Sequence, residues 1–198
     1  QKLIVDVGMA LGARNLLVVS RHEDYNASID QFRDLCERAG DGLRVCLEFG
    51  EFTQIKSLQA ANAFIDAVDH PSAGILIDLM HIARSKEALP DLTASRFPYV
   101  QACDFLQSST AMTGRDYIQA AVDDRYCLGE GEAEASRIDL VRRSDLDISL
   151  EIRSRALRET FPDLNCSYTV QKDRLGPAHA VWLAAPFVKP GDDVLVVF

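Results

Sequence analysis

Five short apolar runs recur along the chain, and the first four are evenly spaced. The runs are NLLVVS (15–20), RVCLEF (44–49), GILIDL (74–79), YVQACD (99–104) and ISLEIR (148–153). Most are continuous rather than alternating, which is typical of parallel strands covered on both faces. The first four start at residues 15, 44, 74 and 99, a spacing of 25 to 30 residues. Such a spacing is typical of one strand–helix unit.

Helical patterns fall between the apolar runs. Residues 27–40 place their apolar positions on one helical face, and Gly40 suits the C-terminal end of that helix. Residues 57–70 repeat the pattern, with Ser57 as the expected N-cap and Pro71 just beyond the end. The sequence therefore predicts an α/β chain of repeated strand–helix units.

Polar residues stand at or just past the C-terminal end of every run after the first. They are Glu48, Asp78, Gln101, Asp104 and Glu151. Repeated strand–helix units form either an open doubly wound sheet or a closed barrel. A barrel gathers these strand ends into one ring above its core, whereas an open sheet spreads most of them along an edge. Taken singly, each residue also suits a strand cap or a solvated loop; taken together, they favour a barrel.

A ring of carboxylates needs a partner, because buried negative charges repel one another and are costly when unpaired. Asp78 ends an almost wholly apolar run, so we expect it to be buried, and its need for a partner is the greatest. A divalent cation would resolve it, with Mn²⁺ or Mg²⁺ favoured by the oxygen donors and Co²⁺ or Zn²⁺ as alternatives. His81 follows Asp78 by three residues and can orient a ligand or touch a substrate. The alternative is a half-exposed histidine at the start of a helix.

Composition narrows the class of partner. The chain has 198 residues, enough for one sizeable core, and its net charge of −9 argues against nucleic acid and anionic membranes as partners. No apolar run approaches the about 20 residues of a membrane span. The five cysteines form no CxxC pair, which favours buried thiols in a reducing compartment and a cytoplasmic location.

Several motifs, taken in order, resemble a known family. LEFGEFT, ILIDLMHIARS, YVQACD, LGEGEAE and SLEIRS occur in the order seen in xylose isomerase-like TIM barrels, over roughly residues 8–163. That superfamily includes sugar-phosphate isomerases and epimerases, inosose dehydratase and a type of 3-dehydroshikimate dehydratase. The resemblance implies a TIM (β/α)8-type barrel.

The resemblance also implies roles for particular residues. The implied metal ligands are Glu48, Asp78, Gln101 and Glu151. Glu48 and Glu151 would also move the proton, with His81 as a further catalytic residue. Arg125 would contact the substrate, and Asp104 would lie next to the ligands as a supporting residue. Arg153 follows Glu151 by two residues, so on a strand it would point the same way, and we expect it to contact the substrate as well. A "GxGxxG" nucleotide motif is not present, since GEGEAE has two glycines and no preceding strand.

The implied activity is that of a divalent-metal-dependent sugar or sugar-phosphate isomerase or epimerase, which removes a proton next to a carbonyl through a metal-stabilised enediolate. The substrate would be a small keto-sugar, polyol or cyclic keto acid. Gln101 stands where many epimerases have a histidine. The dehydroshikimate dehydratases resemble this sequence in having a glutamine at that position, so a metal-dependent dehydratase is the main alternative. A third is an inactive, truncated barrel that serves as a binding or assembly module.

The resemblance begins at the helix before the barrel's fourth strand. We therefore expect residues 1–163 to form only the C-terminal five βα units, four to eight, and residues 164–198 to form an extension of unclear structure. The first three units would then be absent through truncation, or be supplied by another chain or a second copy. The tail reads as strand-like, with an apolar cluster of Val181, Trp182, Leu183 and Phe187.

Overall fold

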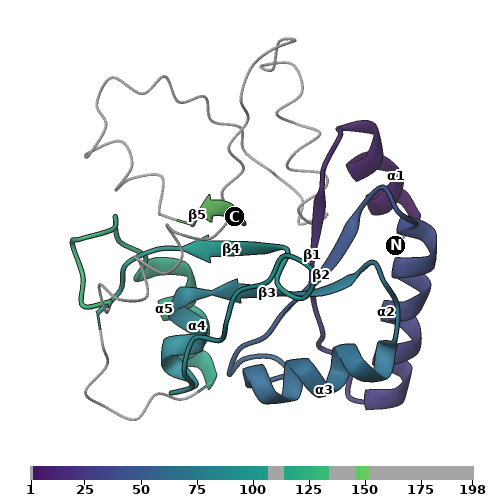
Figure 1. Cartoon of the computed structure of the whole chain (residues 1–198). Helices are drawn as coiled ribbons and strands as arrows, with labels where there is room; N and C mark the ends of the chain where they lie inside the picture. The colour runs from purple at the N-terminus through teal and green to yellow at the C-terminus, as the bar shows by residue number, and fades with distance from the viewer. Residues whose placement is uncertain (1, 107–113, 134–145, 152–198) are drawn as a thin grey trace, which may run out of the picture.

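Five parallel strands and their helices make up the described part of the chain in this computed structural model. The structure describes residues 2–106, 114–133 and 146–151 (Figure 1). In chain order, the elements are α1 (Lys2–Ala10), β1 (Asn15–Val19), α2 (Tyr25–Ala39), β2 (Arg44–Glu48), α3 (Leu58–Val68), β3 (Ala73–Asp78), α4 (Leu79–Arg84), β4 (Tyr99–Ala102), α5 (Gly114–Asp123) and β5 (Asp147–Leu150). The predicted alternation of strands and helices is confirmed in these ranges.

The strands lie in the sheet in the order in which they occur in the chain, β1-β2-β3-β4-β5, and every neighbouring pair is parallel. A doubly wound sheet reverses its strand order at a switch point, whereas a barrel adds each strand beside the last. The sheet curls as half of a barrel does (Figure 1). The arrangement thus follows the barrel alternative. Which units of a complete barrel these are stays a prediction.

The strand register puts the predicted ligands on one face of the sheet. The pairs that fix this are Glu48 with Leu76, Asp78 with Gln101, and Gln101 with Ser149. Side chains alternate between faces along a strand, so residues two apart share a face. Asp78 lies two residues after Leu76, and Glu151 lies two after Ser149. The four predicted ligands therefore all belong to the inner, concave face.

The hydrophobic core lies on the other face, between the sheet and its helices. Leu47, Ile75 and Val100 are fully buried there and pack with apolar residues of α2 and α3. Phe32 of α2 meets Phe64 of α3 edge-on, with ring centroids 5.5 Å apart. The strands β2, β3 and β4 are largely apolar because both of their faces are buried: the outer face packs against the helices, and the inner face lies toward the site.

Both predicted helix caps of this core are confirmed. The Ser57 hydroxyl accepts a hydrogen bond from the Ala60 N–H at 3.1 Å at the start of α3. Gly40 ends α2 with a φ of 55°, and its N–H donates to the Cys36 carbonyl. A φ in this region suits glycine, which explains why α2 stops there.

The sheet curls far enough to bring the starts of β1 and β5 within side-chain reach. Arg14 lies directly before β1, and its guanidinium forms an ion pair at 2.8 Å with Asp147, the first residue of β5. The Asn15 amide donates to the same carboxylate at 3.3 Å. These contacts join positions 132 and 133 residues apart and link β1 to β5.

Four of the five cysteines fall in the described ranges, and all four are buried thiols: Cys36, Cys46, Cys103 and Cys127. Burial raises the pKa of Cys36 and of Cys46 to about 12, so neither is a thiolate at neutral pH. Cys166, Arg153 and the predicted extension 164–198 lie outside the described residues.

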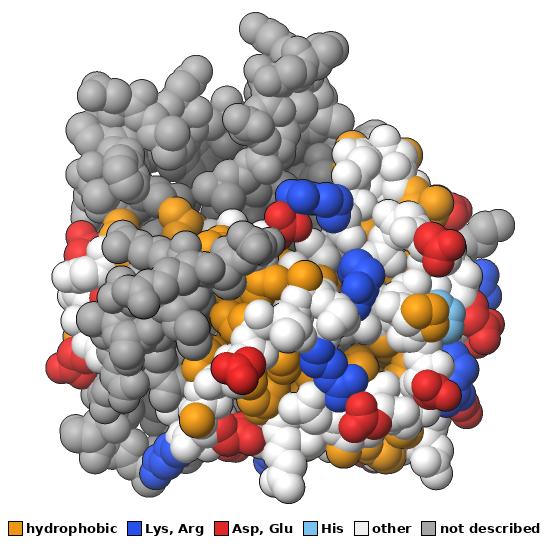
Figure 2. Space-filling view, in the orientation of Figure 1, with side chains coloured by type: hydrophobic (Ala, Val, Ile, Leu, Met, Phe, Trp, Pro, Cys, Tyr) orange, Lys and Arg blue, Asp and Glu red, His pale blue; other side chains and the backbone are white. Residues whose placement is uncertain are grey.

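The surface of the described residues carries mixed charge. On the face drawn in Figure 2, Lys and Arg side chains are interspersed with Asp and Glu rather than gathered into one basic area. None of the helices described is both long enough and apolar enough to span a bilayer.

Candidate metal centre

Two buried carboxylates come from neighbouring strand ends. Glu48 is the last residue of β2 and Asp78 the last residue of β3, and they are 8% and 1% exposed. Asp78 also caps α4, because its Oδ1 accepts hydrogen bonds from the N–H groups of Met80 at 2.7 Å and His81 at 3.1 Å. The strand thus turns straight into a helix whose first turn carries His81.

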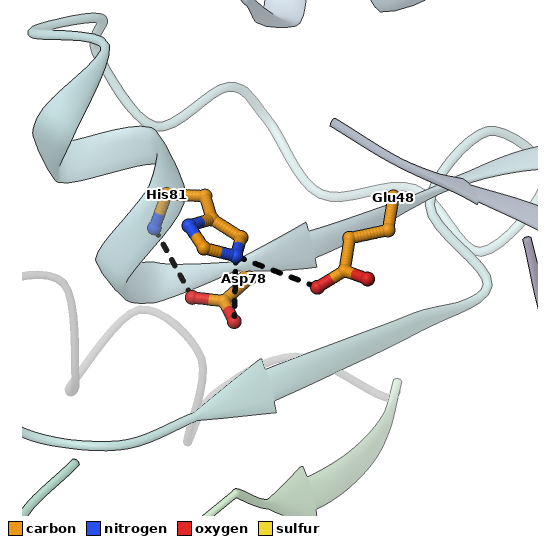
Figure 3. A group of neighbouring side chains, drawn as sticks. All are labelled: Glu48, Asp78 and His81. Atoms are coloured by element: carbon orange, nitrogen blue, oxygen red, sulfur yellow. Dashed lines mark hydrogen bonds and ion pairs between the residues drawn. The ribbon is translucent and has the colours of Figure 1, made fainter. Parts of the chain in front are cut away.

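His81 completes a compact group with these two carboxylates. Its Nε2 lies 3.5 Å from Glu48 Oε1 and 3.7 Å from Asp78 Oδ2 (Figure 3). One ligand atom from each of the three residues lies within 4.8 Å of the others. His81 is 4% exposed, so the half-exposed alternative is wrong. Its Nε2 has no hydrogen-bond partner among the described residues.

Gln101 and Glu151 extend this group along the same face. Gln101 pairs with Asp78 across β3 and β4, and its buried Oε1 accepts no hydrogen bond within the described ranges. Glu151 follows β5 directly, and its N–H donates to the Ala102 carbonyl at 3.0 Å. A buried amide oxygen without a donor is costly, and the predicted role of Gln101 as a metal ligand stays a prediction.

Arg125 lies against two of the predicted ligands. Its guanidinium donates to Asp78 Oδ2 at 2.8 Å and forms an ion pair with Glu151 Oε2 at 3.1 Å. The group is 5% exposed, and its Nε donates to the Ala121 carbonyl at 2.6 Å. The predicted substrate contact of Arg125 stays a prediction, but the sequence did not indicate that this arginine would be bound to the acidic ring.

The pKa values of Asp78 and Glu151, the two carboxylates that contact Arg125, shift in opposite directions. Burial alone would raise the pKa of Asp78, but the guanidinium of Arg125 and the His81 ring hold that pKa well below its usual range. Burial and the nearby Asp78 charge raise the pKa of Glu151 to about 8, although Arg125 opposes the rise. Asp78 is therefore a fixed negative charge, while Glu151 can hold a proton at neutral pH.

Asp104 organises the segment behind the ring. Its carboxylate, 1% exposed, accepts hydrogen bonds from the N–H groups of Phe105 at 2.8 Å and of Gly129 and Ala133 at 2.9 Å. Burial would raise its pKa, but these backbone N–H groups hold it below the usual value. Its backbone pairs in both directions with Tyr126, the neighbour of Arg125. The predicted supporting role of Asp104 stays a prediction.

Glycines allow the segment 127–133 to wrap this carboxylate. Gly129 has a φ of 97°, a conformation that disfavours side chains. A Cβ on Gly131 would lie 2.7 Å from the Phe105 nitrogen and from Asp104 Cγ. The glycines of GEGE therefore serve a turn and a close backbone approach around Asp104.

The donor set fits a divalent cation. It offers buried carboxylates, an amide oxygen and an imidazole nitrogen without thiolates, and two of its atoms, Gln101 Oε1 and His81 Nε2, accept or donate no described hydrogen bond. Mg²⁺ and Mn²⁺ favour such oxygen-rich sites, and one imidazole also suits Zn²⁺ or Co²⁺. The Asp-x-x-His spacing is the signal that could have marked His81 as a ligand, because it sets both groups on one strand-to-helix turn.

The fold and the site agree with a match over most of the chain. Residues 2–165 match the family described as xylose isomerase-like TIM barrel. The chain belongs to this family. Membership confirms the resemblance found in the motifs, and it accounts for the sequential order of parallel strands.

Solved structures of xylose isomerase-like TIM barrels superpose on the chain. The IolI protein with a bound zinc atom is 14% identical, with a TM-score of 0.60 over 79% of this chain and 60% of its own. D-allulose 3-epimerase from Methylomonas sp., in complex with D-allulose, is 19% identical, with a TM-score of 0.57 over 81% and 59%. The probable 3-DHS dehydratase AsbF of Bacillus anthracis is 18% identical, with a TM-score of 0.57 over 76% and 61%. At such identities these likenesses show the fold alone.

Coverage of these relatives is partial. The chain spans about 60% of the IolI, epimerase and dehydratase chains. A segment of 51 residues is 39% identical to the bifunctional protein GlmU of Thermotoga petrophila; it makes up 26% of this chain and 11% of that protein. This match assigns no family, because it covers only a small share of either chain.

Proposed function

We propose that the chain carries the metal site of a divalent-metal-dependent isomerase or epimerase acting on a small keto-sugar or sugar phosphate. The observation that carries this proposal is the group of Glu48, Asp78 and His81, whose ligand atoms lie within 4.8 Å of one another in a buried position at the strand ends. Membership in a family with metal-dependent sugar epimerases and dehydratases supports it.

Glu48, Asp78 and His81 would hold the ion, with Gln101 and Glu151 facing it from the next two strands. When bound, the ion supplies Lewis-acid polarisation of the substrate's carbonyl and hydroxyl oxygens. Mn²⁺ or Mg²⁺ fits the oxygen donors best. Among proteins of similar fold, IolI holds zinc, and a xylose isomerase-like TIM barrel protein from Mycobacterium smegmatis holds magnesium.

The proton transfer is assigned to the two glutamates. Glu48 removes the proton from the carbon next to the carbonyl. Glu151, which faces the site from the end of β5, returns a proton to the opposite face or to the neighbouring carbon. Asp78 stays ionised, so it keeps the charge of the site constant while the glutamates exchange protons.

A metal-dependent dehydratase is the second candidate, and Gln101 is the observation that favours it. Its orphaned Oε1 offers a neutral oxygen in the position where many epimerases have a histidine. The same first step, proton abstraction next to a carbonyl, would then be followed by loss of a β-hydroxyl. The likeness to a probable 3-DHS dehydratase supports this alternative to the same degree as the likeness to an epimerase.

The test combines metal binding with proton exchange. Isothermal titration of the full chain with MnCl₂ and MgCl₂ should show one site, and Glu48→Gln should lose it, whereas the matched control Glu37→Gln, an exposed position on α2, should keep it. With metal present, deuterium from D₂O should enter D-allulose, D-fructose or 3-dehydroshikimate. Exchange with epimerisation supports the first candidate, and net loss of water supports the second. Metal binding without deuterium exchange or loss of water would support an inactive binding module. An absence of metal binding would refute the proposal of a metalloenzyme.

A further inference from the structure

Asp78 has almost no acceptor capacity left for a metal. A carboxylate offers about four lone-pair positions, two on each oxygen. Oδ1 accepts the N–H groups of Met80 and His81, at 2.7 and 3.1 Å. Oδ2 accepts the Arg125 guanidinium at 2.8 Å and lies 3.7 Å from His81 Nε2. One position on Oδ2 therefore remains, on the side that faces His81, and a metal bound there would lie beside the Arg125 guanidinium.

Arg125 is held in this place from several sides. Besides Asp78 and Glu151, it donates to the Ala121 carbonyl at 2.6 Å and to the Cys103 sulfur at 3.3 Å. Its side chain is 4% exposed. The neighbouring Tyr126 is paired in both directions with the backbone of Asp104. The guanidinium is thus a fixed positive charge among the buried carboxylates of the acidic ring, Glu48, Asp78 and Glu151. It is not an exposed group that is free to move away from them.

A fixed cation and a metal ion compete for the same carboxylates. The guanidinium is attracted strongly by the negative charge of these carboxylates, above all by that of Asp78, and much less once a dication has neutralised most of that charge. We infer that Arg125 lowers the affinity of this centre for divalent cations. This inference rests on the proposed metal site and concerns how that site is regulated.

The test measures metal affinity directly, in the absence of substrate. Full-length wild type, Arg125→Gln and Arg84→Gln are titrated calorimetrically with MnCl₂ and with MgCl₂. Arg84 is the matched control, because it is a partly buried arginine near the Asp78 charge that makes no contact with a ring carboxylate. We expect Arg125→Gln to bind Mn²⁺ at least about tenfold more tightly, and Arg84→Gln to stay within about threefold of wild type.

Protons that the metal displaces from the carboxylates would lower the apparent metal affinity, and the number of these protons can be measured. Removing the guanidinium raises the proton affinity of the ring, and a proton that the metal must displace would hide part of the gain. Titrations in two buffers of different ionisation enthalpy give the number of protons released, which corrects the affinity. An equal or weaker corrected affinity for Arg125→Gln overturns the inference. No binding by wild type and by Arg125→Gln refutes the proposed metal site instead.

A second measurement keeps the inference testable if Arg125→Gln does not fold. In wild type labelled with [¹⁵N]arginine, the Arg125 guanidinium signal is assigned by its loss in Arg125→Lys. Saturating Mg²⁺ should shift this signal and speed its hydrogen exchange at least about threefold, because its ion pairs weaken when the ring is neutralised. An unchanged signal with Mg²⁺ bound overturns the inference.

Discussion

Asp78 and Asp104 are two buried aspartates that the fold treats differently. Each is 1% exposed, and in each the pKa lies below its usual range despite burial. Backbone N–H groups of Phe105, Gly129 and Ala133 satisfy the Asp104 carboxylate. The Asp78 carboxylate accepts the backbone N–H groups of Met80 and His81 on one oxygen only, and its second oxygen faces the side chains of Arg125 and His81.

The difference teaches how to separate a structural charge from a functional one. A carboxylate filled by backbone donors is committed to the fold, because removing it orphans amides that cannot move. A carboxylate balanced by side chains leaves an acceptor position and a charge that a ligand can use. Depth of burial and the direction of the pKa shift do not distinguish the two. The identity of the donors does.

Asp104→Ala should give the largest loss of stability. One buried and two partly buried N–H groups lose their acceptor, at about 1–3 kcal/mol each, so we expect the free energy of unfolding to fall by about 4 kcal/mol. Urea denaturation measures this loss. Asp91→Ala, at an exposed position, should stay within about 0.5 kcal/mol of wild type.

The same variant has a pH signature. Since the folded-state pKa of Asp104 is lowered, its stabilisation is complete above the unfolded-state pKa of about 3.9 and is lost as pH falls toward the folded-state value. The stability gap between wild type and Asp104→Ala should therefore narrow between about pH 5 and pH 3. A gap that does not change with pH would contradict a role for the ionised carboxylate.

Asp78→Asn should cost about 3 kcal/mol without metal, because breaking a buried ion pair leaves Arg125 beside a neutral amide. It should also abolish stabilisation by Mn²⁺, which for a wild-type site at one hundred times Kd is about 2.7 kcal/mol. Thermal melts with and without Mn²⁺ measure both effects. Asp104→Ala should be less stable yet retain its response to Mn²⁺, and a lost response in both variants would erase the distinction between the two aspartates.

Gly131→Ala should have the smallest of these effects, about 2 kcal/mol. The new Cβ would lie 2.7 Å from the Phe105 nitrogen, so the segment must shift away from Asp104. Gly42→Ala makes the same chemical change where the nearest atom would be 3.7 Å away, and it should be close to neutral. Chemical denaturation of the two variants compares them. Equal losses would show that the close approach around Asp104 is not needed.

Local patterns predicted the regular elements well. The apolar periodicity located α2 and α3, and Ser57 and Gly40 marked a start and an end, because a cap is a property of a few adjacent residues. The ends of the continuous apolar runs also placed Glu48, Asp78 and Glu151 at or just past the strand ends. Residues 74–79 were predicted as one strand, but β3 ends at Asp78 and α4 begins at Leu79, since the Asp78 carboxylate caps that helix.

The partners within the site were beyond the reach of these patterns. Arg125 meets Asp78 across 47 positions, and Gly129 meets Asp104 across 25. Such contacts depend on how a loop folds back over the strand ends, which residue spacing does not encode. The same holds for the contact between Asn15 and Asp147, which depends on the curl of the whole sheet.

The sequential strand order has a consequence for biosynthesis. Each strand that leaves the ribosome finds its neighbour already made, so the sheet can grow in the direction of translation without waiting for a distant partner. The charges of the centre arrive in the order Glu48, Asp78, Arg125 and Glu151. The nascent chain therefore gains its compensating cation before its last carboxylate, and it never has to enclose all three acids without a counter-charge.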